Sequence, residues 1–318
     1  MTNIVSFNSN LTHLTPLTST TDWDLILQDW LSTKRSPHTQ RVYRKDITNF
    51  LNDVNMTLGK FLSGDRYQGH ELLTRYKGQM ISKELTPATI NRRLAAIKSL
   101  VSHAYQCGHC EFTLETVKGE KMAQYRDTSG IDLDLFKDVL ANVDRSTIIG
   151  VRDYALLVLL WSNALRRSEV AKTDIKDFDP DGMTLRIYGK GRGTEAETVS
   201  LGKGTVMAIS TYLELRGDVN DDDPLFVAHK PGYIGHRLHT NSIYKIVQKR
   251  CEAVGIKKVM SPHRIRHSAI TTALDKTDGD VRKVQKLSRH ANLNTLMIYD
   301  DNRLNAQKDI TEMLDSLI

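Results

Sequence analysis

The chain has 318 residues, of which 40% are hydrophobic and 26% charged, and its formal net charge is +6. That length allows two domains with separate cores, and the composition is typical of a globular protein. The longest apolar run, Tyr154–Trp161, is too short to span a bilayer. Three cysteines exclude a disulfide framework and fit a reducing cytoplasm, so we expect a cytoplasmic protein with no membrane partner.

Residues 1–21 are rich in Ser, Thr and Asn. They carry no Lys or Arg before their apolar residues, which argues against a secretory signal. We expect a flexible N-terminal arm.

Residues 22–110 show helical periodicity, which predicts a compact domain of four helices. Two helices are expected to begin at Ser36–Pro37 and Thr86–Pro87, because Ser or Thr followed by Pro is a helix start signal. The first and last helices place these apolar residues on one face: Trp23, Ile26, Leu27, Trp30 and Leu31, then Ile90, Leu94, Ile97, Leu100, Val101 and Ala104.

This helical domain also holds most of the basic excess. Residues 22–110 contain 13 Lys and Arg against 8 Asp and Glu, a net charge of +5. Such an excess indicates a domain that holds a polyanion, although Arg and Lys are also good residues for a helix surface. The candidate DNA-binding residues on its polar faces are Arg41, Arg44, Lys45, Arg92, Arg93 and Lys98.

Cys107 and Cys110 form a CxxC pair, which can indicate a zinc or redox site. A structural zinc ion needs four ligands, and no second CxxC or HxxxH pair follows. We therefore interpret the pair as a helix end with Gly108 as its cap. Residues 111–130 lack periodicity and are predicted to be an interdomain linker.

Residues 131–318 are predicted to form a second, α+β domain, so the whole chain is mainly α with one small antiparallel sheet. Met183–Tyr188 alternates like a strand, and Glu197–Leu201 returns as its partner. The glycine-rich turn between them carries Lys190 and Arg192. Apolar residues recur along the tail 304–318, which predicts an amphipathic helix that packs on its own domain or on a neighbouring copy.

Reactive side chains gather in the stretch from Ser261 to Tyr299. Ser261 and Pro262 predict a helix start, which places His263 and Arg266 on one face near its N-terminus. His290 and Tyr299 follow further along the chain. A phosphodiester suits this set, because guanidinium binds its oxygens, imidazole moves protons and phenol can attack phosphorus.

Arg166 lies just after the apolar run, where an arginine is costly to bury unless an anion meets it. Each of these residues alone has an ordinary structural explanation. Together with the hairpin lysine, they supply what a phosphoryl-transfer site needs.

An ordered set of four motifs in this chain resembles the tyrosine recombinase (phage integrase) family. The motifs are Ala164–Val170, a Gly-Lys-Gly turn at 189–191, residues 263–267, and His290 followed nine residues later by Tyr299. The resemblance is nearest to its Xer-type and integron-type members. It covers residues 131–302 and extends more weakly back to residue 22. It implies an N-terminal core-binding domain that closes over DNA opposite a catalytic domain.

The resemblance implies metal-independent cleavage and rejoining of duplex DNA through a 3′-phosphotyrosyl intermediate, without a cofactor. Tyr299 would be the nucleophile and His263 its base. Arg166 and Arg266 would hold the non-bridging oxygens, His290 would donate to them, and Lys190 would protonate the leaving oxygen. Glu169 and His267 would orient these groups.

No metal site is expected, because the clustered carboxylates of a two-metal nuclease are missing near the basic residues. The acidic stretches 179–181 and 221–223 are predicted to be solvated loops.

Several residues depart from the family pattern, among them the pair Thr295–Leu296, which keeps only one of two usual threonines. Ala164 and Arg289 stand where the family usually has Gly, and Arg289 would alter a helix cap or add a phosphate contact. Asp300 and Asp301 follow the nucleophile and would repel a phosphate that they faced.

The expected partner is a double-stranded DNA recombination site, bound by a homo-tetramer that is a monomer or weak oligomer when free. Integration, excision and dimer resolution, in a mobile element or a chromosome, all remain open. The alternatives are a type IB topoisomerase, a non-catalytic DNA-binding regulator, and a phosphodiesterase for RNA or small molecules.

Overall fold

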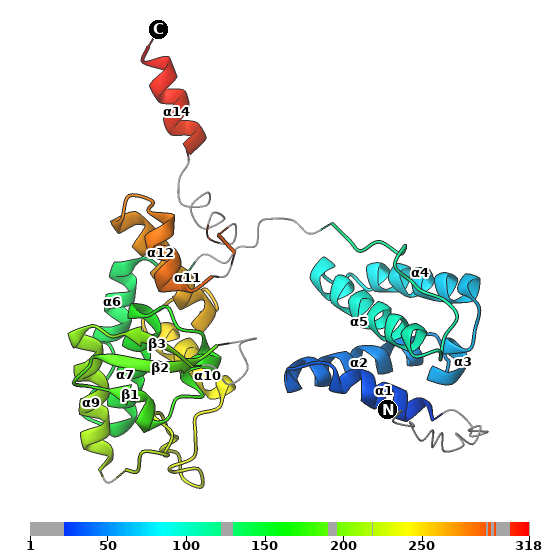
Figure 1. Cartoon of the computed structure of the whole chain (residues 1–318). Helices are drawn as coiled ribbons and strands as arrows, with labels where there is room; N and C mark the ends of the chain where they lie inside the picture. The colour runs from blue at the N-terminus through cyan, green and yellow to red at the C-terminus, as the bar shows by residue number, and fades with distance from the viewer. Residues whose placement is uncertain are drawn as a thin grey trace, which may run out of the picture. The chain divides into compact units, whose positions relative to one another are not determined.

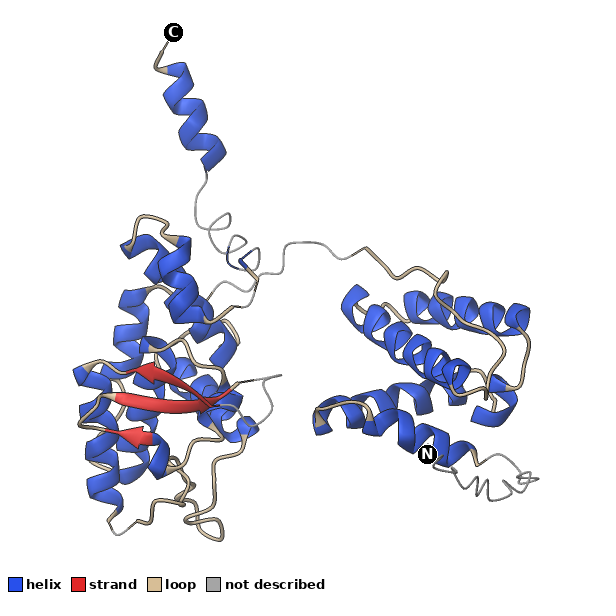
Figure 2. Ribbon diagram, in the orientation of Figure 1, coloured by secondary structure: helices blue, strands red, loops and turns tan. Residues whose placement is uncertain are grey.

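The computed structural model describes residues 22–121, 130–189, 196–217, 219–290, 292–293, 296 and 306–317, with the side chains of 306–310 excepted. The chain divides into two compact units, residues 1–125 and 126–318. Figure 1 shows that helices dominate both units, and Figure 2 shows that the one sheet belongs to the second. The predicted fold class, mainly α with a small antiparallel sheet, is confirmed.

The first unit contains the four long helices that the periodicity predicts, together with one short helix that it does not. Each helix begins after a side-chain N-cap of the expected type, either Asp, Ser or Thr. The helices are α1 Trp23–Ser32, α2 Pro37–Asp53, α3 Leu58–Leu62, α4 Arg66–Ser82 and α5 Pro87–Gln106. The additional helix, α3, buries Leu58, Phe61 and Leu62.

Aromatic rings fill the centre of the first unit. The Phe50 ring packs edge-on against Phe61 at 4.9 Å and against Tyr76 at 5.1 Å, measured between centroids. Phe112 and Leu114 are also buried in this core. The stretch 111–130, predicted as a linker, therefore begins with residues that fold into the first unit, because their apolar side chains leave water there.

The CxxC pair marks the end of α5. Gly108 has a left-handed φ of 75°, and its N–H donates to Tyr105 O at 3.1 Å. The His109 N–H donates to Ala104 O at 2.8 Å, which completes a Schellman motif. The helix-end interpretation is confirmed. Across the described residues, no three His, Cys, Asp or Glu side chains gather as a possible metal site.

The second unit begins with α6 (Leu133–Ala141), α7 (Ile148–Ser162) and α8 (Arg167–Val170). A 3-10 turn follows, and then the sheet. Among the described residues, the helices that follow are α9 Lys203–Arg216, α10 Thr240–Glu252, α11 Pro262–Lys276, α12 Val281–Ser288 and α14 Ala306–Asp315.

The sheet has three antiparallel strands in the order β1-β2-β3: Phe178–Asp179, Thr184–Tyr188 and Ala196–Ser200. The hairpin register runs from Thr184 opposite Ser200 to Tyr188 opposite Ala196. The predicted hairpin is confirmed, and its tip, 190–195, lies outside the described residues.

Helix α7 is the centre of the second unit, and it packs against α6, α9 and α11. Leu156, Leu157, Leu159 and Leu160 are fully buried in its core. Each buried leucine contributes about 1.5–3 kcal/mol relative to an exposed one. Helix α7 ends at Ser162, so this core fixes the position from which the chain continues to Arg166.

The tail forms α14, as the amphipathic pattern predicts, and Met313, Leu314 and Leu317 are exposed. Over the part of the chain that is described, no helix combines the length and apolar character needed to cross a membrane.

Candidate active site

The N-terminus of α11 carries two of the predicted catalytic residues. The Ser261 side chain accepts a hydrogen bond from the Arg264 N–H at 3.2 Å, and Pro262 occupies the first turn. This cap confirms the predicted helix start. His263 lies in the first turn of α11, and Arg266 lies three residues further along the same face.

Arg266 is almost completely buried, with 1% of its surface exposed. Its guanidinium donates to the carbonyl oxygens of Ala164 and Ser288. It also lies 3.3 Å from His290 Nε2. Because a guanidinium has no acceptor, His290 Nε2 accepts this hydrogen bond. Arg266 therefore joins α11 to the loop after α7 and the loop after α12.

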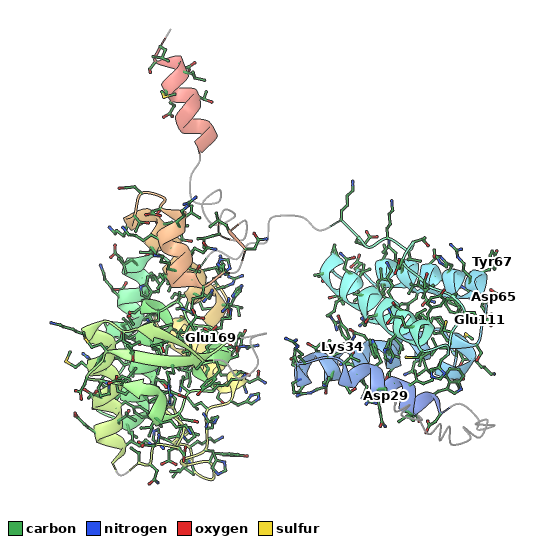
Figure 3. The ribbon with its side chains drawn as sticks, in the orientation of Figure 1. Asp29, Lys34, Asp65, Tyr67, Glu111 and Glu169 are labelled. Atoms are coloured by element: carbon green, nitrogen blue, oxygen red, sulfur yellow. The ribbon has the colours of Figure 1, made fainter. Side chains whose placement is uncertain are left out.

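Arg166 is the N-cap residue of α8 and is held by Glu169, which Figure 3 labels. Glu169 Oε2 accepts from the Arg166 backbone N–H at 2.8 Å, and Oε1 accepts from Arg166 Nη1 at 2.6 Å. The Glu169 side chain is 1% exposed and that of Arg166 is 34% exposed. The arginine is therefore fixed on one side and open on the other.

Glu169 is ionised despite its burial. Burial opposes the charge, but hydrogen bonds from Arg166 and the charges of Arg289 and Arg166 outweigh it and lower the pKa of Glu169. The carboxylate of Glu169 therefore holds Arg166 through two hydrogen bonds, and its orienting role stays a prediction.

The three histidines lie beside the arginines and are neutral at neutral pH. Burial, and then Arg266 and Arg166, lower the pKa of His263. Burial and neighbouring positive charges lower the pKa of His267 to about 3 and that of His290 to about 4. The rings of His263 and His267 meet edge-on at 4.7 Å between centroids. A neutral His263 can accept a proton, as a base must.

A pocket of about 400 Å³ opens at the exposed side of Arg166. Its lining combines residues of α8, α10 and α11: Arg166, Arg167, Ser168, Tyr244, Ser261, Pro262, His263 and Arg266. Sequence reasoning missed Tyr244, whose position on α10 between the buried Ile243 and Val247 gives only a helical packing signal. It is the described tyrosine that lines this pocket.

Lys190, Arg192, Tyr299, Asp300 and Asp301 lie outside the described residues, so their predicted roles stay predictions. Leu296, three residues before the proposed nucleophile, is fully buried with residues of α11 and α12.

Two other tyrosines have partners away from this pocket. Tyr188 donates to Asp177 Oδ1 at 3.1 Å, and this hydrogen bond raises the pKa of Tyr188. The ring of Tyr154 faces the Arg145 guanidinium at 4.6 Å.

The basic residues predicted to bind DNA fall into two groups. Arg41, Arg44 and Lys45 are exposed on α2. The three on α5 instead have partners within the first unit. Arg92 pairs with the buried Asp46 at 2.5 Å, Arg93 donates to Tyr76 Oη at 3.1 Å, and Lys98 donates to Val117 O.

Comparison with known proteins assigns this chain to a family. A model described as the phage integrase family matches residues 131–305, more than half of the chain. The chain therefore belongs to the phage integrase family and is a tyrosine recombinase, a site-specific DNA recombinase.

Two curated relatives illustrate the similarity. The tyrosine recombinase slr0733 of Synechocystis sp. is 46% identical over 302 residues, which cover 92% of this chain and 95% of that one. Tyrosine recombinase XerC of Pelobacter propionicus is 31% identical over 271 residues, which cover 85% and 87%.

Solved structures share the fold. A lambda integrase dimer bound to a COC′ core site gives a TM-score of 0.66 at 13% identity, covering 89% of this chain and 77% of that one. XerH bound to palindromic difH substrate gives a TM-score of 0.60 at 21% identity, covering 79% of this chain and 73% of that one.

Proposed function

We propose that this recombinase cleaves and rejoins duplex DNA through a covalent bond between Tyr299 and a 3′-phosphate, and exchanges strands through a Holliday junction. The observation that carries the proposal is the convergence of Arg166, His263 and Arg266 on one pocket, with His290 beside Arg266. Arg166 and His290 are 124 positions apart in the chain, so only folding can bring these residues together.

The arginines supply the charge that a pentacoordinate phosphate requires. Arg166 is held by Glu169 and faces the pocket, where it can bind one non-bridging oxygen. Arg266 lines the same pocket and can bind the other, and both guanidinia then stabilise the negative charge that builds up.

In this proposal His263 acts as the base, and His290 donates a hydrogen bond to the phosphate. Neutral His263 accepts the phenol proton of Tyr299, whose ordinary pKa of about 10 leaves it protonated at neutral pH. His290 accepts from Arg266 here. When a phosphate oxygen replaces His290 as the acceptor for Arg266, the neutral ring can adopt the tautomer with its proton on Nε2 and donate from Nε2 to that phosphate.

Lys190 completes the reaction in this proposal by protonating the departing 5′-oxygen. The β2–β3 hairpin supports this role, because its paired strands end on either side of the segment that carries Lys190. The proposed step breaks the phosphorus–oxygen bond to the 5′-oxygen and forms one to the tyrosine oxygen, so the free energy of the phosphodiester is kept for rejoining.

Three finer properties belong to the same proposal. The arginines stabilise the negative charge on the phosphate oxygens, which a metal ion would otherwise do, so cleavage needs no metal ion. Met313 and Leu314 of α14 and Leu317 just after it are exposed and offer apolar surface for a neighbouring copy, which supports assembly as a tetramer on DNA. The bacterial recombinases among its relatives support a place at DNA in the cytoplasm.

A suicide substrate, nicked beside the cleavage site, tests the proposal. The wild type should form a covalent complex that survives denaturing electrophoresis, with EDTA present or absent. Tyr299→Phe should abolish this complex, a loss of about a thousandfold or more, and should bind DNA normally because only the nucleophilic oxygen is lost. Tyr244→Phe is the matched control in the same pocket and should still form the complex.

The opposite pattern, with a covalent complex in Tyr299→Phe and none in Tyr244→Phe, would assign the nucleophile to Tyr244. A wild-type reaction that stops in EDTA and returns with magnesium would contradict the metal-independent mechanism.

A further inference from the structure

Arg289 has an unusual backbone for its residue type. It follows α12 as the C-cap, with a left-handed φ of 55°, and its N–H donates to Gln285 O at 2.7 Å. Glycine tolerates this conformation better than any residue with a β-carbon. The backbone conformation at position 289 would favour glycine. The presence of arginine there must therefore be explained by what its side chain does.

That side chain turns inward and is only 8% exposed. Its Nη1 donates to the carbonyl oxygens of Leu287 at 2.8 Å and Asn163 at 3.2 Å. Its Nη2 donates to Glu169 Oε2 at 3.0 Å. The pocket lining does not include Arg289. Position 289 keeps the left-handed cap conformation that glycine favours, and the side chain is directed to Glu169, so the predicted phosphate contact stays a prediction.

Glu169 links Arg289 to Arg166. Its Oε1 holds the Arg166 guanidinium, and its Oε2 holds both the Arg166 backbone N–H and Arg289. One buried carboxylate therefore lies between two guanidinia. The three side chains together carry a net charge of +1, whereas Arg166 and Glu169 alone would carry none. Arg289 thus keeps positive charge at a site that receives an anion.

We propose that Arg289 is a positioning residue, which acts through Glu169 to orient Arg166 and to preserve its positive field for the scissile phosphate. This inference rests on the proposed function. It adds to that function a residue whose head group never touches DNA.

Arg266 contacts the same two segments of the chain as Arg289. Arg266 donates to the carbonyls of Ala164 and Ser288, and Arg289 donates to those of Asn163 and Leu287. Each guanidinium thus binds one carbonyl from the loop after α7 and one from the end of α12. We name these two residues the paired arginines.

The test is a single-turnover measurement of covalent complex formation at saturating DNA, with DNA affinity and melting temperature measured alongside. Arg289→Gly removes the guanidinium and relieves the backbone, so the variant should fold. We expect cleavage about tenfold slower or more, with DNA affinity unchanged within about twofold. Arg289→Lys keeps the charge and should recover part of the rate. Asp278→Gly relieves another left-handed position, at φ 50°, and is the matched control.

A double-mutant cycle separates positioning from general structural damage. In a Glu169→Gln background, Arg289→Gly should change the rate by less than about twofold, because the link is already lost. The proposal would be overturned if the rate losses of Arg289→Gly and Glu169→Gln multiplied in the double variant. It would also be overturned if Arg289→Gly cleaved at the wild-type rate. If Arg289→Gly does not fold, the same cycle with Arg289→Lys decides. Failure of the wild type to form the complex would contradict the proposed function instead.

Discussion

The histidines of the site share one physical setting, burial beside arginines. For His267 and His290 this setting lowers the pKa to about 3 and about 4, from an ordinary value of 6.5. Between these lowered pKa values and pH 6.5, the two histidines are therefore protonated in the unfolded chain and neutral in the folded chain. Within that window the free energy of unfolding falls as the pH falls, because protonation favours the unfolded state.

A pH series of melting temperatures tests this setting without any need for DNA. The wild type should lose stability as the pH falls from 6.5 towards 4. His267→Gln should lose less, because it removes one group that the folded state keeps neutral. His236→Gln replaces an exposed histidine of the same unit and is the control. Equal slopes for His267→Gln and the wild type would show that burial of His267 does not destabilise its charged form.

Among the elements, the β2–β3 hairpin makes the most specific chemical prediction. Lys190→Ala should slow cleavage of ordinary DNA by about a hundredfold or more, as expected for loss of a general acid. A substrate with a bridging 5′-phosphorothiolate should recover most of that loss, because sulfur leaves without a proton. Lys203→Ala, an exposed lysine at the start of α9, is the control. Equal impairment on both substrates would limit Lys190 to DNA positioning and make Arg192 the better candidate.

Elements with local signals could be predicted from the sequence. Ser261 and Pro262 begin α11, and the alternation before Tyr188 forms β2, because capping and strand pairing depend on neighbouring residues. The family motifs also predicted Arg166 and Arg266 as site residues, and both line the same pocket.

Long-range partners could not be predicted in this way. The contact between Arg289 and Glu169 spans 120 positions, and that between Arg92 and Asp46 spans 46. No local pattern records which buried carboxylate a basic side chain will meet. The sequence therefore identified Arg92 as a surface cation, whereas the fold pairs it with Asp46.

For the whole molecule, the charge distribution remains the main argument for how DNA is held. The first unit carries most of the basic excess, but Arg92, Arg93 and Lys98 are engaged in contacts within that unit. The exposed Arg41, Arg44 and Lys45 of α2 are better placed to meet phosphates. Neutralising phosphates releases counterions, so these residues should control the salt dependence of binding.

A salt titration of DNA affinity for two triple variants distinguishes these groups. Replacing Arg41, Arg44 and Lys45 by Ala should lower the slope of log K against log salt by up to about three, with little change in melting temperature. Replacing Arg92, Arg93 and Lys98 should lower the melting temperature, because Asp46 is then left buried without Arg92 and Arg93. An unchanged slope in the α2 variant would show that these cations are only a solvated surface.

The two carbonyl contacts of Arg266 imply that this enzyme can lose its chemistry by two physically different routes. Changing Tyr299 removes one oxygen and should leave an intact protein that occupies its DNA site without reacting. Changing Arg266 also removes the donor to two buried carbonyls, and each unsatisfied carbonyl costs about 1–3 kcal/mol. The first kind of inactive protein competes with active copies for DNA, whereas the second is lost to unfolding before it can interfere.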